Sequence, residues 1–166
     1  MKVTRLAGAV LVGAAVTLFG CRDSEPLAPH PADLLFGPVG LLGCSPLPAD
    51  SVTLTIGPEG GTLDVGAHRL TVPAGALFEP VAITAIAPTG TVNQVRFQPE
   101  GLVFARSAAL TMSYANCDVL GSLLPKRVAY TSDALGILEY LPSIDNVFAR
   151  RVTGRVQHFS TYAIAW

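Results

Sequence analysis

The stretch VTLTIGPEGGTLDVGAHRLTV at residues 52–72 decides the fold class of this 166-residue chain. Residues 52–56 alternate between apolar and polar side chains and then meet the turn-forming sequence GPEGG at residues 57–61. Residues 62–65 and 68–72 continue as two short runs around Gly66. Because successive side chains of a β-strand point to opposite faces, this pattern predicts three short strands joined by tight turns.

Outward from this stretch, short alternating runs bounded by turn residues continue to the C-terminus. Further strands are expected at residues 80–87, 94–98, 108–115, 126–131, 137–141, 148–152 and 155–166. Turn residues recur about every eight to twelve positions, which is the usual spacing of turns in antiparallel β-sandwiches. No helix of ordinary length and no internal repeat is evident. The sequence therefore predicts an all-β domain, an antiparallel β-sandwich.

The N-terminal residues 1–20 are organised as a signal peptide. Lys2 and Arg5 give a positive start, and the uncharged run that follows is too short for a bilayer crossing of about 20 residues. The tetrapeptide LFGC at residues 18–21 resembles the processing site of bacterial lipoproteins, which implies a lipid on Cys21. Ordinary secretory cleavage beside a free Cys21 is the alternative. Arg22, and not aspartate, follows the cysteine, so an outer-membrane or outer-surface location is expected rather than the inner membrane.

The chain after the signal has a Pro- and Gly-rich start and then a single domain. Residues 21–43 are predicted to be the lipidated cysteine and a tether, and residues 44–166 the β-sandwich. Leu41 and Leu42 are unusually apolar for a linker and either dock on the domain or lie near the lipid. With the signal removed, nine basic residues face 12 acidic ones, which argues against nucleic acid as a partner.

Two further cysteines, Cys44 and Cys117, lie within the predicted domain. In an oxidising envelope, two thiols in one domain favour one disulfide, and two separately buried thiols are the alternative. No histidine or cysteine stands at metal-ligand spacing from either one, so neither a metal site nor a cofactor is expected.

Three motifs stand out in the predicted domain: GPEGGTL at residues 57–63, LTVPAGAL at 70–77, and PEG at 99–101 followed by Phe104 and by Leu110-Thr111. Together they resemble the ZU-5 domain, a module of netrin receptors, ankyrins, death-domain scaffolds and bacterial envelope proteins. Ser107-Ala108 stands where family members often have a proline. The resemblance implies a β-sandwich interaction domain that is not by itself an enzyme. The motifs have a physical basis, because Gly60 and Gly61 permit a sharp turn with φ above zero, and Gly75 lets the chain fold back so that Leu77 enters the core.

The tripeptide His158-Phe159-Ser160 resembles the self-cleavage site of some ZU-5 proteins and of the GAIN domain of adhesion receptors. Residues two apart on a strand share a face, so His158 would take the proton of Ser160, which would attack the Phe159 carbonyl. Ordinary packing of the three residues is the alternative reading. The other histidines, His30 and His68, are expected to be solvated.

The sequence thus favours a lipid-anchored envelope protein with a non-enzymatic structural or protein-interaction domain. Its expected partners are the membrane, through Cys21, and an unidentified envelope protein or surface ligand. Two alternatives stay open. One is self-cleavage between Phe159 and Ser160, and the other is binding of a carbohydrate or small ligand. The aromatic residues available to a sugar are Tyr114, Tyr130, Tyr140, Tyr162 and Trp166.

Overall fold

The computed structural model describes residues 40–119 and 124–166 of the chain. Within these ranges the regular structure consists of β-strands, as the sequence predicts. The strands in chain order are β1 (Asp50–Ile56), β2 (Gly61–Val65), β3 (His68–Val72), β4 (Val81–Ala87), β5 (Gln94–Gln98), β6 (Val103–Ser113), β7 (Arg127–Thr131), β8 (Ile137–Tyr140), β9 (Ser143–Asn146), β10 (Arg151–His158) and β11 (Thr161–Ala165).

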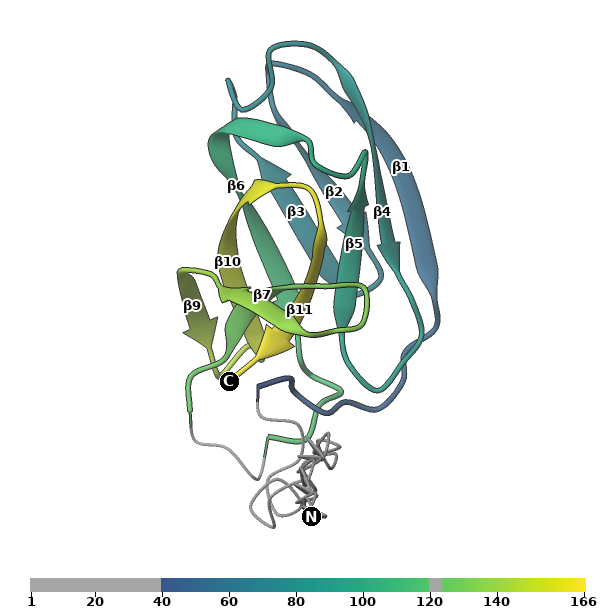
Figure 1. The fold of residues 1–166 in the computed structure, drawn as a ribbon, viewed down its shortest axis with the longest axis vertical. Coiled ribbons are helices and arrows are strands. Elements are labelled where there is room, and N and C mark those ends of the chain that lie inside the picture. Colours follow the sequence, from purple (N-terminus) through teal and green to yellow (C-terminus); the bar gives the residue numbers. More distant parts are fainter. Residues whose placement is uncertain (1–39, 120–123) are drawn as a thin grey trace, which may run out of the picture. The chain divides into compact units, whose positions relative to one another are not determined.

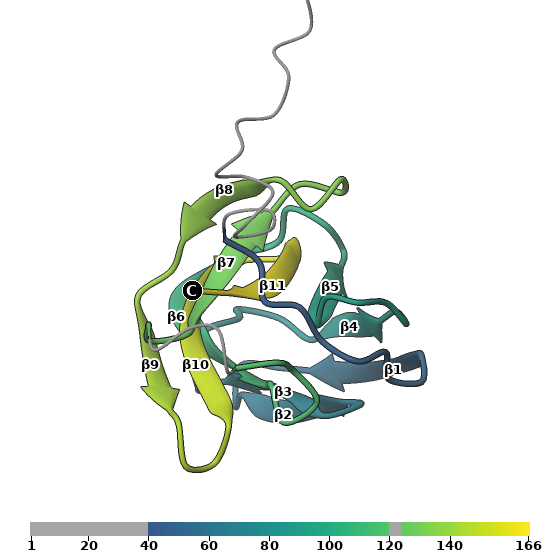
Figure 2. The same cartoon turned by 90° about the horizontal axis from the view of Figure 1, so that it is seen from below.

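The strands form two antiparallel sheets that pack against each other, and the predicted β-sandwich is confirmed (Figures 1 and 2). The six-stranded sheet has the order β1-β4-β5-β11-β7-β8, and the five-stranded sheet has the order β2-β3-β6-β10-β9. No helix in the described ranges is long and apolar enough to cross a membrane.

Alternation of side chains builds the core between the sheets. Along β3, His68, Leu70 and Val72 are buried, while Arg69 and Thr71 are exposed. Neighbouring strands supply matching residues such as Leu110 of β6, which pairs with Leu70 and is fully buried. Burying a side chain of this size contributes about 1.5–3 kcal/mol. The apolar face of each strand therefore points toward the core, and this fixes the register in which neighbouring strands pair.

The glycines of the ZU-5-like motifs occupy backbone turns. Gly60 has a φ of 78°, and a Cβ at this position would lie 2.4 Å from the carbonyl oxygen of Val72. Gly75 also has a positive φ, of 74°, and its N–H donates to the Pro58 carbonyl. The prediction of a positive φ is confirmed at Gly60 and wrong at Gly61, and Leu77 is buried after the turn at Gly75, as expected. Position 60 requires glycine for two reasons: its φ is positive, and the neighbouring backbone leaves no room for a Cβ atom.

The last third of the domain differs from the sequence prediction. The expected single strand over residues 155–166 is two strands, β10 and β11, which belong to different sheets. The prediction of a strand over residues 148–152 is also wrong, because the chain turns at residues 147–150 and β10 starts at Arg151. Asp145 and Asn146 end β9, the edge strand beside β10, which the sequence pattern did not predict. Period-two patterns do not reveal which sheet a strand joins, and this caused the errors.

The apolar residues just before Cys44 dock on the domain. Leu42 is fully buried, and its N–H donates to the Ile164 carbonyl at 2.9 Å. Leu41 forms an isolated bridge with Ala165, and the Trp166 N–H donates to the Gly40 carbonyl at 3.0 Å. The folded part of the chain therefore includes residues 40–43, which the sequence assigns to the tether.

Candidate functional site

The tripeptide His158-Phe159-Ser160 lies where the chain passes from one sheet to the other. β10 ends at His158 in the five-stranded sheet, and β11 begins at Thr161 in the six-stranded sheet. The pairing of β10 with β6 shifts register between Val156 and His158, and His158 pairs with Val103 at the start of β6. We name these three residues the His158 corner. Phe159 and Ser160 are not strand residues, so the expectation that His158 and Ser160 share a strand face is wrong.

Aromatic packing and backbone hydrogen bonds hold the His158 corner in place. The Phe159 ring is 1% exposed and contacts Phe97, with centroids 5.5 Å apart, and Phe104, with centroids 5.0 Å apart. The Phe159 N–H donates to the Leu102 carbonyl at 2.8 Å, and its own carbonyl accepts from the Gly101 N–H at 3.0 Å. A backbone donor therefore already points at the carbonyl oxygen on which a self-cleavage reaction would develop negative charge.

His158 faces two tyrosines. Its ring packs edge-on against Tyr130, with centroids 4.9 Å apart, and lies 6.2 Å from the Tyr162 ring. The Tyr162 hydroxyl donates to the His158 carbonyl at 2.5 Å. Burial raises the pKa of the Tyr162 phenol far above its usual value, so this group stays a donor. Within the described residues, no hydrogen bond joins the His158 ring to the hydroxyl of Ser160, which is 6% exposed.

A hollow of about 280 Å³ opens beside His158. Its polar lining comes from both sheets and includes Glu139 of β8 and Arg155 of β10. Tyr162 is the aromatic residue in its lining, and it is 1% exposed, so it offers no open face for a sugar ring. This hollow is where the small-ligand alternative would have to be located, with a carboxylate and a guanidinium as its charged groups.

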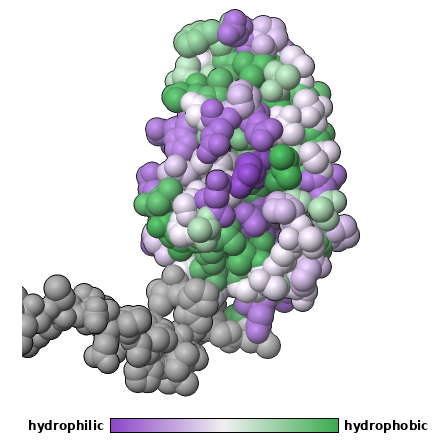
Figure 3. Space-filling view, turned by 45° about the vertical axis from the view of Figure 1, so that its right-hand side comes forward, coloured by the Kyte–Doolittle hydropathy of each residue, from purple (hydrophilic) through white to green (hydrophobic). Residues whose placement is uncertain are grey.

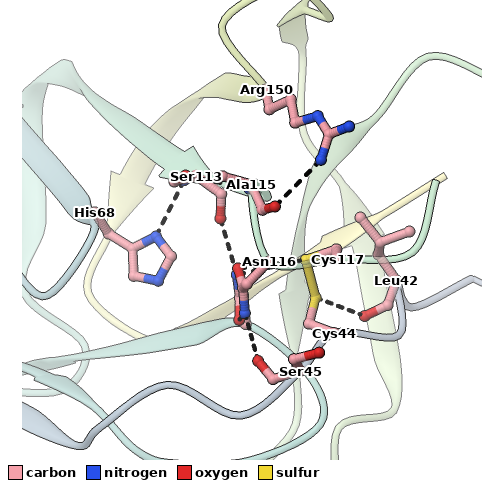
Figure 4. The surroundings of a disulfide bond; sticks show 10 residues. Leu42, Cys44, Ser45, His68, Ser113, Ala115, Asn116, Cys117 and Arg150 are labelled. Carbon is pink, nitrogen blue, oxygen red and sulfur yellow. Dashed lines mark hydrogen bonds between the residues drawn. A yellow bond between two sulfur atoms is a disulfide. The ribbon is translucent and has the colours of Figure 1, made fainter.

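The predicted disulfide is present in the structure. Cys44 and Cys117 are joined with an S–S distance of 2.06 Å, across a sequence separation of 73 residues (Figure 4). Cys44 precedes β1 of the six-stranded sheet, and Cys117 follows β6 of the five-stranded sheet. The bond therefore ties the segment before β1 to the connection between β6 and β7.

Side-chain amides surround the disulfide with hydrogen bonds (Figure 4). Asn93 Nδ2 donates to the Ser113 carbonyl at 2.9 Å and to Asn116 Oδ1 at 2.8 Å. Asn116 Nδ2 donates in turn to the Ser45 carbonyl at 2.6 Å. Asn93 is 5% exposed, so these bonds satisfy polar groups that water does not reach. Sequence reasoning missed Asn93, because no motif surrounds it.

His68 belongs to the same network, and the expectation that it is solvated is wrong. It is 4% exposed, and its Nδ1 accepts from the Ser113 N–H at 3.2 Å. Burial lowers the pKa of His68 to about 4. A neutral imidazole is needed here as an acceptor, so His68 has a structural role. The alternation along β3 places it on the buried face, which was the available signal.

The end of the domain that holds the disulfide also includes the turn between β9 and β10. The Tyr114 N–H donates to the Arg150 carbonyl at 2.9 Å, and the Arg150 guanidinium donates to the Ala115 carbonyl at 3.3 Å. We name residues 40–45, 113–118 and 147–151 together the Cys44 end. A hollow of about 320 Å³ lies between its loops, lined by residues that include Val119 and Val147.

The structure does not test the predictions for Cys21 and His30. Cys21 and His30 lie outside the described residues. In the described ranges, no group of three or more histidine, cysteine or acidic side chains is placed to hold a metal ion.

No protein-family model matches the chain, and no curated protein matches its sequence. The resemblance to the ZU-5 domain therefore stays a prediction from its motifs.

Proposed function

We propose that this chain is a lipid-anchored protein of the cell envelope whose β-sandwich is a non-enzymatic structural or protein-interaction module. The anchor is Cys21, which follows a signal-like sequence, and an outer-membrane or outer-surface location accords with Arg22 after it. The ZU-5-like motifs agree with an interaction role. A disulfide-linked sandwich is a rigid body suited to presenting a surface to another protein.

The observation that carries the interaction role is a pair of exposed apolar side chains near the His158 corner. Phe78 is 88% exposed and Val103 is 70% exposed. The Ala105 N–H donates to the Ala76 carbonyl at 2.9 Å, and each of the two exposed residues lies two positions from this bond. Large apolar side chains on adjacent segments at the surface mark contact sites for other proteins.

Val103 lies at the far end of β6 from the Cys44 end, because β6 runs from Val103 to Ser113. An eleven-residue strand is about 33 Å long, so the apolar pair would be presented away from the tether. This is the position that a displayed binding surface needs.

Site-specific photo-cross-linking in living cells tests the interaction role. A photoreactive phenylalanine replaces Phe78, and the matched control places it at Thr55, an exposed residue of β1. The expected result is one discrete adduct with one envelope protein from position 78, which disappears in a Val103→Ser variant. The same adducts from both positions, or none from position 78, would rule out this surface.

Self-cleavage is the second candidate, supported by the Gly101 N–H that donates to the Phe159 carbonyl. The Ser160 oxygen would attack the Phe159 carbonyl carbon, the C–N bond would break, and the freed amine would take a proton. Water would then hydrolyse the resulting ester to a carboxylic acid and the Ser160 alcohol. β11 pairs with β5 and β7, so the released segment would remain bound as a central strand.

The denatured intact mass decides between the two candidates. A single uncut chain supports the interaction module and removes self-cleavage. Loss of residues 160–166, restored by Ser160→Ala, would establish self-cleavage and displace the non-enzymatic reading.

A further inference from the structure

We infer that the Cys44 end docks on the lipid surface that carries the anchor, with Phe148 and Val147 entering the membrane interface. This inference rests on the proposed lipid anchor at Cys21, and it adds a second, noncovalent contact between the domain and the membrane. The partner is the bilayer itself and not a second protein.

The first observation is the composition of the turn between β9 and β10. Phe148 is 98% exposed and Val147 is 61% exposed, at consecutive positions of a tight turn. Leu124, which lines the adjacent hollow, is 60% exposed. A fully exposed phenylalanine at the tip of a turn gives the fold no core packing, and exposed apolar side chains at adjacent positions are the kind of surface that contacts a membrane or a partner.

The second observation is that this turn lies at the same end of the domain as Gly40, the first described residue. The Arg150 carbonyl accepts from Tyr114, Cys117 is bonded to Cys44, and the described chain begins four residues earlier at Gly40. Figure 1 shows the dark-blue start of the described chain, the turn after β9 and the C-terminus at the lower end, and Figure 2, seen from below, shows that the turn lies at the opposite edge of this end from the start of the described chain. Figure 3 shows a different face of the domain, on which hydrophobic residues near the lower end lie below a band of hydrophilic residues and beside further hydrophilic residues.

The length of the intervening chain makes the membrane the nearest large partner. The segment between Cys21 and Gly40 spans at most about 65 Å even when fully extended. Covalent anchoring therefore converts contact between the Cys44 end and the lipid into an intramolecular event at high effective concentration. A few apolar side chains suffice under these conditions, although they would not bind a membrane from solution.

The charges of this end indicate insertion of apolar groups and not attraction to anionic lipid. Lys126 and Arg150 line the hollow together with Asp145, and Asp118 lies next to Val119 of its lining. With Arg151, which belongs to the Cys44 end but does not line this hollow, three basic groups stand against two acidic ones, a net charge of only +1. Asp145 accepts from the Tyr114 hydroxyl at 2.7 Å and from the Lys126 backbone N–H at 2.8 Å. Docking should therefore occur on zwitterionic lipid and depend little on salt.

Tryptophan fluorescence in vesicles tests the inference, because Trp166 is the single tryptophan of the chain. The full chain is produced in a bacterial host, purified from its membranes, and reconstituted into phosphatidylcholine vesicles with or without brominated acyl chains. Two variants carry Trp166→Phe together with either Phe148→Trp or the matched control Phe78→Trp. Both phenylalanines are almost fully exposed, so neither substitution disturbs the core.

The expected result is quenching of the Phe148→Trp emission by about twofold or more in brominated vesicles, with a blue shift. The Phe78→Trp emission should change little. Adding Val147→Asp to the Phe148→Trp variant should reduce the quenching, because a carboxylate is poorly tolerated at the acyl boundary. Raising the salt concentration should leave the quenching unchanged.

The failures of the anchor and of the docking are distinguishable. The intact mass of the purified protein shows whether Cys21 carries acyl chains. Absence of that mass would overturn the lipid anchor, and the docking with it. An acylated protein in which both tryptophans are quenched equally, or neither is, would overturn the docking alone. A concentration-dependent dimer without quenching would assign Phe148 to a contact between copies of the chain.

Discussion

The two ends of the β6–β10 pair join the same two sheets by different means. At the His158 corner, the chain itself crosses between the sheets, and Phe97, Phe104 and Phe159 pack around the crossing. At the Cys44 end, a disulfide and a hydrogen-bonded network around Asn93 do the same. At the His158 corner, apolar side chains fill the interior, and their burial holds the sheets together. At the Cys44 end, polar backbone groups lie between the loops, and a covalent bond and hydrogen bonds take the place of apolar packing.

The largest expected effect tests the packing at the His158 corner. Phe159→Ala removes a buried ring from contact with Phe97 and Phe104 and should lower the free energy of unfolding by about 3–5 kcal/mol. Urea denaturation followed by circular dichroism measures it. A loss below about 1 kcal/mol would mean that the corner does not depend on aromatic packing.

Removal of the disulfide tests the opposite end. A double Cys44→Ala, Cys117→Ala variant should lose about 4 kcal/mol, because the closed loop of 73 residues restricts the unfolded chain. Thermal melts of the oxidised protein and of the double variant compare the two. If the variant melts within a few degrees of the wild type, the polar network alone holds this end, and the contrast between the ends is purely one of packing.

The polar network also makes the Cys44 end sensitive to pH. The pKa of His68 is about 4 in the folded state, against about 6.5 in an unfolded chain, so the unfolded state binds more protons between these values. Stability is therefore complete above about pH 6.5 and should fall by up to about 3 kcal/mol as the pH drops toward 4.

A His68→Gln variant is the control for this pH effect, because glutamine keeps an acceptor for the Ser113 N–H without titrating. Denaturation curves at pH 7 and pH 4.5 should show a smaller decrease for the variant than for the wild type. Equal decreases would attribute the acid sensitivity to carboxylates elsewhere and not to His68.

The smallest effect on stability is expected at the turn of the Cys44 end. Phe148→Ala removes the same side chain as Phe159→Ala, but from a position 98% exposed, so the free energy of unfolding should change by less than about 0.5 kcal/mol. The same urea titration measures it. A loss comparable to that of Phe159→Ala would mean that Phe148 packs within the domain and is not available to a membrane.

The sequence was sufficient for elements that short-range patterns control. The alternation in residues 52–72 predicted β1 to β3, and Gly60 was assigned to a sharp turn because glycine adopts a positive φ without strain. The disulfide followed from having two thiols in one domain, with a single possible connectivity. These features depend on nearby residues or on counting, so they can be derived without coordinates.

Only the tertiary structure decided which strands share a sheet and what lies at each end of the sandwich. Alternation within residues 155–166 is the same whether the chain continues in one sheet or crosses to the other, so the break at Phe159 was not visible. His68 and Asn93 acquired their roles from Ser113, which lies 45 and 20 residues away from them. The exposure of Phe148 likewise depends on where β9 ends and β10 starts, which pairing with β6 determines. Contacts of this kind are set by packing between distant segments, and no local pattern encodes them.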